Sequence, residues 1–518
     1  MEHPTIHVPE RYNFARHILE RNADRAGKLA YIDDTCELSY AELDKRVRSC
    51  AAGLLALGIR PEERVLLIMQ DSVDLPVAFL GALLAGVIPV PVNTLLPPEE
   101  HAYMLNDSGA RAVIASVSLL TGVQQAMALA AVEVPLVAAG NADILPHGTL
   151  RFAHLLEHAP LEAPNDSAAD QFAFWLYSSG STGRPKGTVH SHANLFWTAE
   201  LYGKAVLGVH EDDVVFSAAK LFFAYGLGNA LTFPLYAGAT TILMAERPTP
   251  QAVCERLVRQ QPTVFCGVPT LYVGLLASDC LPSKASTALR ICTSAGEALP
   301  KNIGERFSSH FGCDILDGLG STEMLHIFLS NHQGDIRYGV TGKPVTGYEV
   351  QLRDDAGGTV APGEIGDLYI RGPSSALMYW NNRAKSEATF QGGWTRSGDK
   401  YVLDAEGYYT YAGRSDDMLK VSGQYVSPIE VESVLMDHAA VCECAVVGKP
   451  DAQGLTRTLA YVVTHASCHG DDALVLELRT WVKARLAPHK CPREVIFLAD
   501  LPKTATGKIQ RFKLRAIA

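Results

Sequence analysis

Short apolar runs and amphipathic segments alternate along the first 300 or so residues of the chain. Ser39-Tyr-Ala-Glu42 has the spacing of a capping box, and it opens an apolar-periodic segment that Gly58 ends. Residues 64–69 form a continuous apolar run, which is typical of a strand in a parallel sheet covered on both faces. We expect the alternation to continue with a strand near 111–115, a helix near 122–129 and further strands near 134–138, 214–217, 240–244, 264–267 and 291–294. This rhythm predicts an α/β fold with mixed or parallel sheets covered by helices.

The pattern changes from about Gly342, where short strand-like runs and turns follow each other roughly every ten residues. This texture predicts a β-rich subdomain. A helix is expected at 428–436, followed by two strands near 442–448 and 458–463 and a helix near 474–486. A chain of 518 residues exceeds what one hydrophobic core usually serves. We therefore predict a large N-terminal domain, residues 1–414, and a small α+β C-terminal domain, residues 415–518.

One apolar run, residues 75–92, approaches the length that spans a membrane. Pro76, Pro89 and Pro91 interrupt it, which favours a buried helix followed by a strand over a membrane span. The first ten residues show no signal-peptide pattern. We expect no association with a membrane.

Composition and charge narrow the class of protein. Hydrophobic residues make up 47% of the chain and charged residues 19%, as in ordinary globular proteins. The net charge of -11, without a basic run, argues against a nucleic-acid surface. Eleven scattered cysteines, with no C-x-x-C pair, fit reduced thiols in a cytoplasmic protein better than a disulfide framework or a metal site.

The stretch Tyr177–Gly187, YSSGSTGRPKG, is the strongest candidate for chemistry. It is too rich in glycine for a stable helix, and its N–H groups, hydroxyls and lysine could surround a polyphosphate. It lacks the Walker A spacing, and Pro185 prevents a helix from opening on the lysine. A flexible surface loop is the alternative, but the strand-like FAFWLY before it favours a phosphate loop. The candidate ligands are Ser178, Ser179, Gly180, Ser181, Thr182, Gly183 and Lys186.

This stretch resembles the phosphate loop of the adenylate-forming superfamily, which includes acyl-CoA ligases, luciferases and the adenylation domains of peptide synthetases. Two later segments, Ser294-Ala-Gly-Glu297 and Asp317-Gly-Leu-Gly-Ser-Thr-Glu323, resemble the adenine and Mg²⁺ motifs of that family. Each alone is a commonplace loop; both follow predicted strands, where open α/β sheets hold ligands. The resemblance implies that adenine lies between Ala295, Gly296 and Glu297 and, on the other side, Asp317, Gly318 and Leu319.

The same resemblance implies that Thr322 binds phosphate and that Glu323 holds Mg²⁺, a hard cation suited to oxygen ligands. Asp317-Gly318 stands where the family usually has an aromatic residue, so adenine stacking is expected from a neighbouring residue.

Trp394-Thr-Arg-Ser-Gly-Asp399 resembles the ribose motif, and Arg414 and Asp416 resemble the ribose-contacting arginine and the inter-domain hinge. The alternative for this region is a surface hairpin with ordinary charges. Near the C-terminus, PKTATGKIQR matches the family's terminal lysine motif. The implied catalytic residue is Lys508, which would stabilise charge on the α-phosphate, whereas Lys503 is a decoy; a solvated, idle lysine is the alternative.

The resemblance implies two half-reactions with ATP and CoA as co-substrates. A carboxylate attacks the α-phosphate of ATP, and the mobile small domain then rotates about Asp416, opening a CoA tunnel beside Gly423. It is also compatible with a homodimer and with a lysine acetyltransferase that acts on Lys508. Acetylation would remove the charge of Lys508 and stop adenylation; full adenylation by an acetylated sample would contradict this.

The acyl pocket is expected from two stretches, KLFFAYGLG and GSTEMLHI, which resemble those of the benzoate-CoA ligases and their 4-hydroxybenzoate relatives. The expected lining is Phe223, Ala224, Tyr225, Gly320, His326 and Ile327. An apolar slot favours benzoate, activated for the degradation of an aromatic compound. His326 is read either as a satisfied core histidine or, like Tyr225, as a partner for a ring hydroxyl, which keeps 4-hydroxybenzoate as the alternative.

Three other functions share the fold. A stand-alone enzyme that adenylates an aryl acid and loads a carrier protein would carry every ATP motif. A non-catalytic nucleotide-binding regulator has no chemical need for Lys508, Glu323 and Asp399 together. A luciferase-type oxygenase is supported by the fold alone.

Overall fold

The protein was analysed as a computed structural model, which describes residues 7–180, 183–415, 417–421, 424–450, 456–465, 468–503 and 509–517. The chain forms two compact units. The first unit comprises residues 1–350 and 370–396, and the second comprises residues 351–369 and 397–518. The domain boundary expected after Arg414, together with the mobility of the part that follows, stays a prediction.

The first unit contains a nine-stranded sheet with the spatial order β16-β15-β14-β13-β12-β10-β11-β1-β2. Strands β14 to β1 in this order pair in parallel, whereas β15, β16 and β2 pair antiparallel with their neighbours. The bounds are β1 Leu29–Ile32, β2 Glu37–Ser39, β10 Val214–Ser217, β11 Thr240–Ile242, β12 Val264–Gly267, β13 Ile291–Ser294, β14 Ile315–Gly320, β15 Ile327–Ser330 and β16 Lys343–Pro344.

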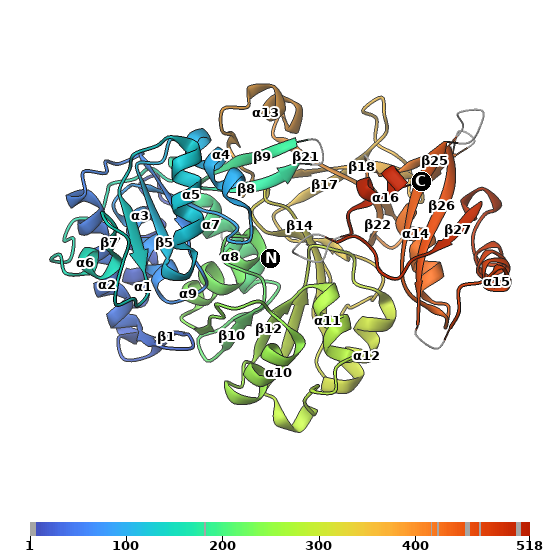
Figure 1. Cartoon of the computed structure of the whole chain (residues 1–518), viewed down its shortest axis with the longest axis horizontal. Coiled ribbons are helices and arrows are strands. Elements are labelled where there is room, and N and C mark those ends of the chain that lie inside the picture. Colours follow the sequence, from blue (N-terminus) through green and yellow to red (C-terminus); the bar gives the residue numbers. More distant parts are fainter. Residues whose placement is uncertain are drawn as a thin grey trace. The chain divides into compact units, whose positions relative to one another are not determined.

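Three helices contribute to the core that packs on this sheet (Figure 1): α10 Pro250–Arg259, α11 Pro269–Leu276 and α12 Lys301–Phe311. Leu257, Tyr272 and Phe307 project from these helices onto Phe265 of β12 and Ile315 of β14. Strands β12 and β13 are buried at every position, which explains why they read as continuous apolar runs in the sequence.

A second sheet of the first unit is all parallel, with the order β4-β3-β5-β6-β7. Helix α2 packs on α3, and α4 packs on α5. The bounds are α2 Tyr40–Ala56, β3 Arg64–Ile68, α3 Asp74–Leu84, β4 Ile88–Pro91, α4 Pro98–Ser108, β5 Ala112–Ser116, α5 Leu120–Ala130, β6 Leu136–Ala139 and β7 Leu150–Arg151. The capping box is confirmed, because Ser39 Oγ accepts from Glu42 N and the Glu42 carboxylate accepts from Ser39 N.

The apolar run at 75–92 divides between α3 and β4, as its prolines predict. No helix among the described residues has the length and apolar character needed to cross a membrane.

A three-stranded sheet, β19-β9-β8, completes the sheets used by the candidate site in the first unit. Its strands are β8 Phe172–Gly180, β9 Gly183–Ser191 and β19 Met378–Tyr379. The remaining elements of the unit are short: α1 Phe14–Arg21, α6 Phe152–Leu156, α7 His192–Thr198, α8 Ala224–Leu227, α9 Phe233–Ala237, α13 Arg383–Thr389 and β20 Phe390–Gln391.

The second unit contains a three-stranded sheet, β25-β26-β27, with α14 and α15 packed on a common apolar core. A smaller cluster around Tyr461 includes Leu514 of α16. The bounds are β22 Tyr409–Arg414, β23 Leu419–Val421, β24 Gln424–Val426, α14 Pro428–Met436, β25 Val441–Pro450, β26 Thr456–Thr464, α15 Asp472–Lys483, β27 Glu494–Phe497 and α16 Arg511–Ile517. Strands β17 Glu349–Arg353, β18 Ile365–Arg371 and β21 Trp394–Leu403 cross the boundaries between the units.

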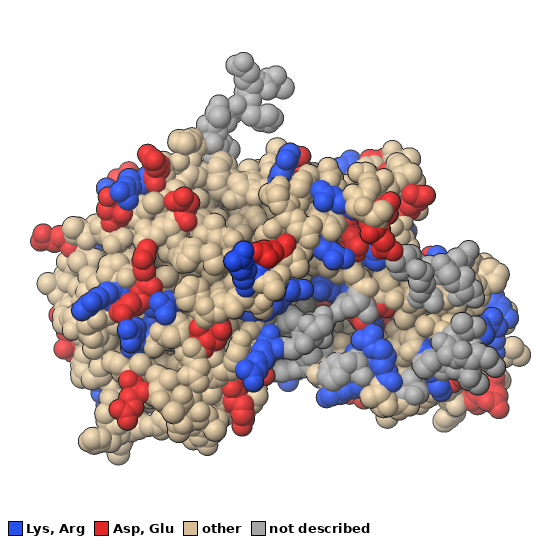
Figure 2. Space-filling model, turned by 90° about the horizontal axis from the view of Figure 1, so that it is seen from above, with Lys and Arg blue, Asp and Glu red and all other residues tan. Residues whose placement is uncertain are grey.

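These features confirm the predicted fold class, an α/β part with sheets covered by helices, a β-rich region and an α+β C-terminal part. On the left part of the face in Figure 2, Lys and Arg side chains lie beside Asp and Glu side chains.

Candidate active site

The predicted phosphate loop is mostly a β-hairpin. Strand β8 continues through Ser178 to Gly180, and β9 begins at Gly183, so that Ser178 pairs with Lys186. Most of the stretch is therefore paired strand, and its role in phosphate binding stays a prediction. The reason for the strand pairing is tertiary: β9 also pairs with β19 on its other edge, and this pairing overrides the weak strand propensity of glycine. The predicted ligands Ser181 and Thr182 lie outside the described residues. The structure also does not describe the side chain of Ser179 or the burial of Gly180 and Gly183.

The pairing of β9 with β19 brings Tyr379 between two predicted site residues. The Tyr379 hydroxyl donates a hydrogen bond of 2.7 Å to Glu323 Oε1. Lys186 Nζ lies 4.4 Å from the centroid of the Tyr379 ring and 3.5 Å from its oxygen. The structure thus brings together the lysine of the phosphate hairpin and the carboxylate predicted to hold Mg²⁺.

The turn that carries Thr322 and Glu323 is fixed by its backbone. His190 contacts the carbonyl oxygen of Thr322 through Nε2 at 2.8 Å, and the Ala376 N–H donates to the carbonyl of Glu323 at 2.7 Å. Burial lowers the pKa of His190 to about 4, so the ring is neutral at pH 7. Nε2 must then carry the proton, and Nδ1 accepts from the Asn194 amide at 2.9 Å.

The two adenine motifs lie on neighbouring strands. Strands β13 and β14 pair in parallel, with Ser294 opposite Asp317. Ala295 is buried, Gly296 is exposed with a φ of +96°, and Glu297 and Leu319 are partly exposed. The structure therefore brings the two predicted adenine walls to one edge of the sheet, at the carboxyl ends of its strands.

Asp317 is an ionisable residue of these motifs whose side chain is buried. Burial raises its pKa to about 8, although Ser294 and the N–H groups of Leu299 and Gly318 lower it. The carboxyl group is accordingly protonated at pH 7 and can donate a hydrogen bond.

Two glycines of β14 allow strand β15 to approach closely. A Cβ on Gly318 would lie 2.8 Å from Ile327 Cγ2, and one on Gly320 would lie 2.7 Å from the carbonyl oxygen of His326. Glycine is therefore required at both positions. This close approach places Ile327 opposite Gly320 in the β14–β15 pair, and His326 directly precedes β15.

The predicted acyl residues differ in burial. Tyr225 and His326 stack, with ring centroids 5.6 Å apart, and the Tyr225 hydroxyl donates to the Gly267 carbonyl at 3.2 Å. His326 and Ile327 are buried, Ala224, Tyr225 and Gly320 are partly exposed, and 38% of Phe223 is exposed. Phe223 is therefore the most exposed of the six.

His326 is only half satisfied. Its Nε2 contacts the carbonyl oxygen of Tyr225 at 3.3 Å, while its buried Nδ1 has no hydrogen-bond partner among the described residues. Burial lowers the pKa of His326 to about 3, so the ring is neutral. Because Nε2 donates its proton to a carbonyl, Nδ1 presents an unused acceptor.

The predicted ribose residues belong to the second unit. Asp399 and Arg414 face each other across the β21–β22 pair, with Arg414 Nη1 3.1 Å from Asp399 Oδ1. The structure thus brings these two residues together. Asp416, Gly423 and Lys508 lie outside the described residues, and their roles stay predictions. Lys503, the decoy, forms an ion pair of 2.7 Å with Glu443.

The sequence analysis missed Tyr379, His190 and Asn194. His190 is close in sequence to the phosphate stretch and lies in a continuous buried run of β9, from Gly187 to Ser191. Tyr379 joins the site through the pairing of β19 with β9. No local sequence pattern predicts that pairing.

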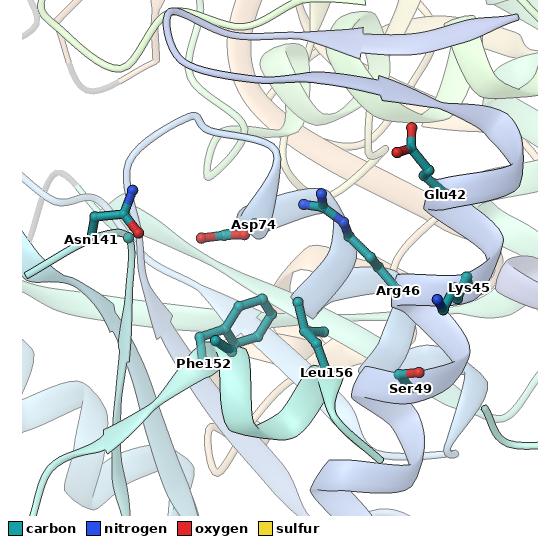
Figure 3. Close-up of a pocket in the computed structure, with 10 residues that line it drawn as sticks. Glu42, Lys45, Arg46, Ser49, Asp74, Asn141, Phe152 and Leu156 are labelled. Carbon is teal, nitrogen blue, oxygen red and sulfur yellow. The ribbon is translucent and has the colours of Figure 1, made fainter. Parts of the chain in front are cut away.

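A cavity of about 500 Å³ lies elsewhere in the first unit, against α2, α3 and α6 (Figure 3). Arg46 and Asp74 extend toward each other above the Phe152 ring. None of the predicted site residues lines it.

Comparison with known proteins gives consistent relatives over the whole chain. Residues 19–380 match the family model of AMP-binding enzymes, and residues 430–508 match that of the AMP-binding enzyme C-terminal domain. The benzoate–CoA ligase of Thauera aromatica is 54% identical over 99% of this chain and 97% of its own length. The 4-hydroxybenzoate–CoA/benzoate–CoA ligase of Rhodopseudomonas palustris is 45% identical, over 97% and 94%.

Among solved structures, a benzoate CoA ligase from Burkholderia xenovorans LB400 is 60% identical with a TM-score of 0.91, covering 97% of this chain and 100% of that one. The anthranilate CoA ligase AuaEII, solved in complex with anthranoyl-AMP, is 41% identical with a TM-score of 0.92, covering 99% and 98%. Together with the paired adenine motifs and the Glu323 turn, these matches show that the chain belongs to the AMP-binding, adenylate-forming family of enzymes.

Proposed function

We propose that this protein is an ATP-dependent benzoate–CoA ligase, which converts benzoate, ATP and CoA into benzoyl-CoA, AMP and pyrophosphate through a benzoyl-adenylate. The observation that carries the proposal is the 54% identity with the Thauera aromatica benzoate–CoA ligase over 99% of the chain. The partly exposed aromatic ring of Tyr225 and the buried aliphatic side chain of Ile327 are compatible with an unsubstituted ring.

In the first half-reaction, an oxygen of the benzoate carboxylate attacks the α-phosphorus of ATP, and the bond to the bridging oxygen of pyrophosphate breaks. The β8–β9 hairpin and Lys186 are proposed to bind the phosphates, and the β13 and β14 strand ends to bind adenine. Asp399 and Arg414 are proposed to bind the ribose. Lys508 is proposed to offset the negative charge that develops on the α-phosphate.

The residues present fit a magnesium ion. Glu323 is partly exposed and accepts the Tyr379 hydrogen bond at Oε1, and the Thr322 hydroxyl lies in the same turn. No group of three metal-ligating His, Cys, Asp or Glu side chains exists in the described part of the chain, so the proposed ion would depend on phosphate oxygens for further ligands. When bound, Mg²⁺ would neutralise phosphate charge.

In the second half-reaction, the CoA thiol loses its proton and its sulfur attacks the benzoyl carbonyl carbon, and AMP leaves. We place the domain boundary for this step after residue 414, with Asp416 as the pivot and Gly423 beside the path of CoA. A homodimer is proposed on family resemblance. A cytoplasmic location is proposed from the free state of all eleven cysteines.

One observation favours 4-hydroxybenzoate as a second substrate. The unused Nδ1 of His326 is an acceptor beside the proposed acyl residues, and a phenolic hydroxyl is a donor. If only a ligand can donate a hydrogen bond to Nδ1, a phenolic hydroxyl would increase the affinity of the protein for the hydroxylated ring.

The test is thioester formation from ATP and CoA over a panel of acids: benzoate, 4-hydroxybenzoate, 2-aminobenzoate, cyclohexanecarboxylate, hexanoate and acetate. We expect benzoyl-CoA to dominate, and Lys508→Ala to reduce adenylation by about 100-fold or more because it removes the charge at the α-phosphate. Lys503→Ala is the matched control, since it removes a lysine that already pairs with Glu443.

Preference for an aliphatic acid would refute the proposed acyl pocket and leave the ATP site standing. Adenylate formation without any thioester would point to a carrier-protein thiol as the acceptor. Equal losses in Lys508→Ala and Lys503→Ala would refute the catalytic assignment.

A further inference from the structure

Tyr379 is held in place by contacts that do not involve ATP. Its backbone pairs with Thr188 of the phosphate hairpin, its N–H donates to Ser386 Oγ at 2.9 Å, and its ring packs against Phe390 with centroids 5.3 Å apart. Only 3% of the residue is exposed. The phenol is therefore a fixed group on a paired strand.

The fixed phenol contacts two groups of opposite charge. Its hydroxyl lies 2.7 Å from Glu323 Oε1, and its ring centroid lies 4.4 Å from Lys186 Nζ. No ion pair between Lys186 and Glu323 is found among the described residues, although both charges approach the same phenolic oxygen. The tyrosine thus stands between a cation and an anion that would otherwise attract each other.

We propose that Tyr379 is a positioning residue of the ATP–metal site, which aims the Glu323 carboxylate at the metal and supports the Lys186 ammonium group with its ring face. This inference rests on the proposed function, in which Glu323 holds the divalent cation. It assigns no contact between Tyr379 and the reacting atoms.

The chemistry follows from the hydrogen bond. A phenolic O–H that donates to one carboxylate oxygen fixes the plane of the carboxylate and leaves the second oxygen for a cation. The ring face favours an ammonium group without neutralising it, so the contact holds the Lys186 side chain beside the hairpin while leaving its charge intact.

The first test uses Tyr379→Phe, which removes the hydroxyl and keeps the ring. Mn²⁺ binding to the enzyme–ATP complex, with no carboxylic acid present, is followed by the electron paramagnetic resonance of free Mn²⁺. We expect about tenfold weaker Mn²⁺ binding, the usual effect of losing a hydrogen-bond partner of a metal ligand. Tyr40→Phe is the matched control, because it removes a buried hydroxyl that also donates at 2.7 Å, to the Ala239 carbonyl away from the motifs.

Tyr379→Leu tests the second contact, because it removes the aromatic face as well. When EDTA removes divalent cations, we expect Tyr379→Phe to bind ATP like the wild type. Tyr379→Leu should bind ATP about threefold more weakly, because Lys186 loses its contact with the aromatic ring. A merely structural role would instead lower the melting temperature and weaken ATP and Mn²⁺ alike in both variants, which would overturn the proposal.

Glu323→Gln separates the failure of this inference from the failure of the proposed function. If Glu323→Gln weakens Mn²⁺ binding and Tyr379→Phe changes it by less than about twofold, the role of Tyr379 is refuted and the metal assignment stands. If Glu323→Gln has no effect, both assignments are refuted, while benzoyl-CoA formation by the wild type still decides the overall reaction.

Discussion

Two buried histidines of the first unit occupy contrasting environments. His190, on the phosphate hairpin, uses both ring nitrogens, Nε2 toward the Thr322 carbonyl and Nδ1 toward the Asn194 amide. His326, behind the acyl residues, uses Nε2 toward the Tyr225 carbonyl and leaves Nδ1 buried without a described partner. Burial lowers the pKa of both rings, to about 4 for His190 and about 3 for His326.

The two rings therefore differ in how fully the described structure satisfies their nitrogens. A buried polar group without a hydrogen bond costs free energy, whereas a fully bonded one stabilises the fold around it. His190 fixes the turn of Thr322 and Glu323 and is committed to that task. Burial of the His326 Nδ1 without a described hydrogen bond costs free energy, and binding of a hydrogen-bond donor would offset this cost.

The largest effect is expected from His190→Ala. It removes two hydrogen bonds and leaves a cavity, so the free energy of unfolding should fall by about 3 kcal/mol. Urea unfolding of wild type and variant at pH 7 measures the difference. A loss below about 1 kcal/mol would show that the His190 bonds are not structural.

The second effect concerns acid stability. The unfolded chain protonates His326 below pH 6.5, while the folded chain resists protonation down to about pH 3. Stability is therefore lost as the pH falls through 6.5 toward 3, and about 2 kcal/mol of it is lost between pH 7 and pH 5 for such a residue. His326→Leu should lose about 2 kcal/mol less than the wild type over this interval, because His190 titrates in both proteins. Parallel urea titrations at the two pH values check this, and equal losses would contradict it.

A third effect concerns the choice of acid. His326→Leu fills the same space without an acceptor, so kcat/KM for 4-hydroxybenzoate relative to benzoate should fall about tenfold. Competition between the two acids for limiting CoA measures the ratio, and His326→Gln, which retains an acceptor, is the matched control. An unchanged ratio would show that Nδ1 faces no ring hydroxyl.

The smallest effect is expected from His158→Ala. His158 is exposed on a connection between elements, so the change in unfolding free energy should stay within about 0.5 kcal/mol. A larger change at pH 7 would mean that loss of any imidazole perturbs the protein, and the comparison of His190 with His326 would lose its meaning.

The fold follows from the sequence where burial imposes a pattern on consecutive residues. Strands β10, β12 and β13 occupy the predicted residues, because a strand buried on both faces is apolar throughout. Helix α14 begins at Pro428 after a Ser427 side chain that caps it, and both signals are local.

The site follows from the sequence less completely, because its geometry depends on pairing between distant segments. Ser294 and Asp317 come together since their strands are neighbours in a parallel sheet, a relation that strand order alone can suggest. Tyr379 reaches Glu323 only through the pairing of β19 with β9. The half-satisfied state of His326 depends on a single carbonyl of Tyr225, which no residue pattern encodes.

The close contact of β15 with Gly318 and Gly320 sets limits for engineering this protein toward new acids. Any side chain at these two positions would meet Ile327 or the His326 backbone within 2.8 Å, so mutant libraries there should yield misfolded clones. Diversity belongs instead at Ala224, Tyr225 and His326, where side chains rather than backbone define the space. If the proposed sites are correct, a redesign that keeps the glycines and varies these three positions would change acid specificity and retain the proposed nucleotide-binding strand ends.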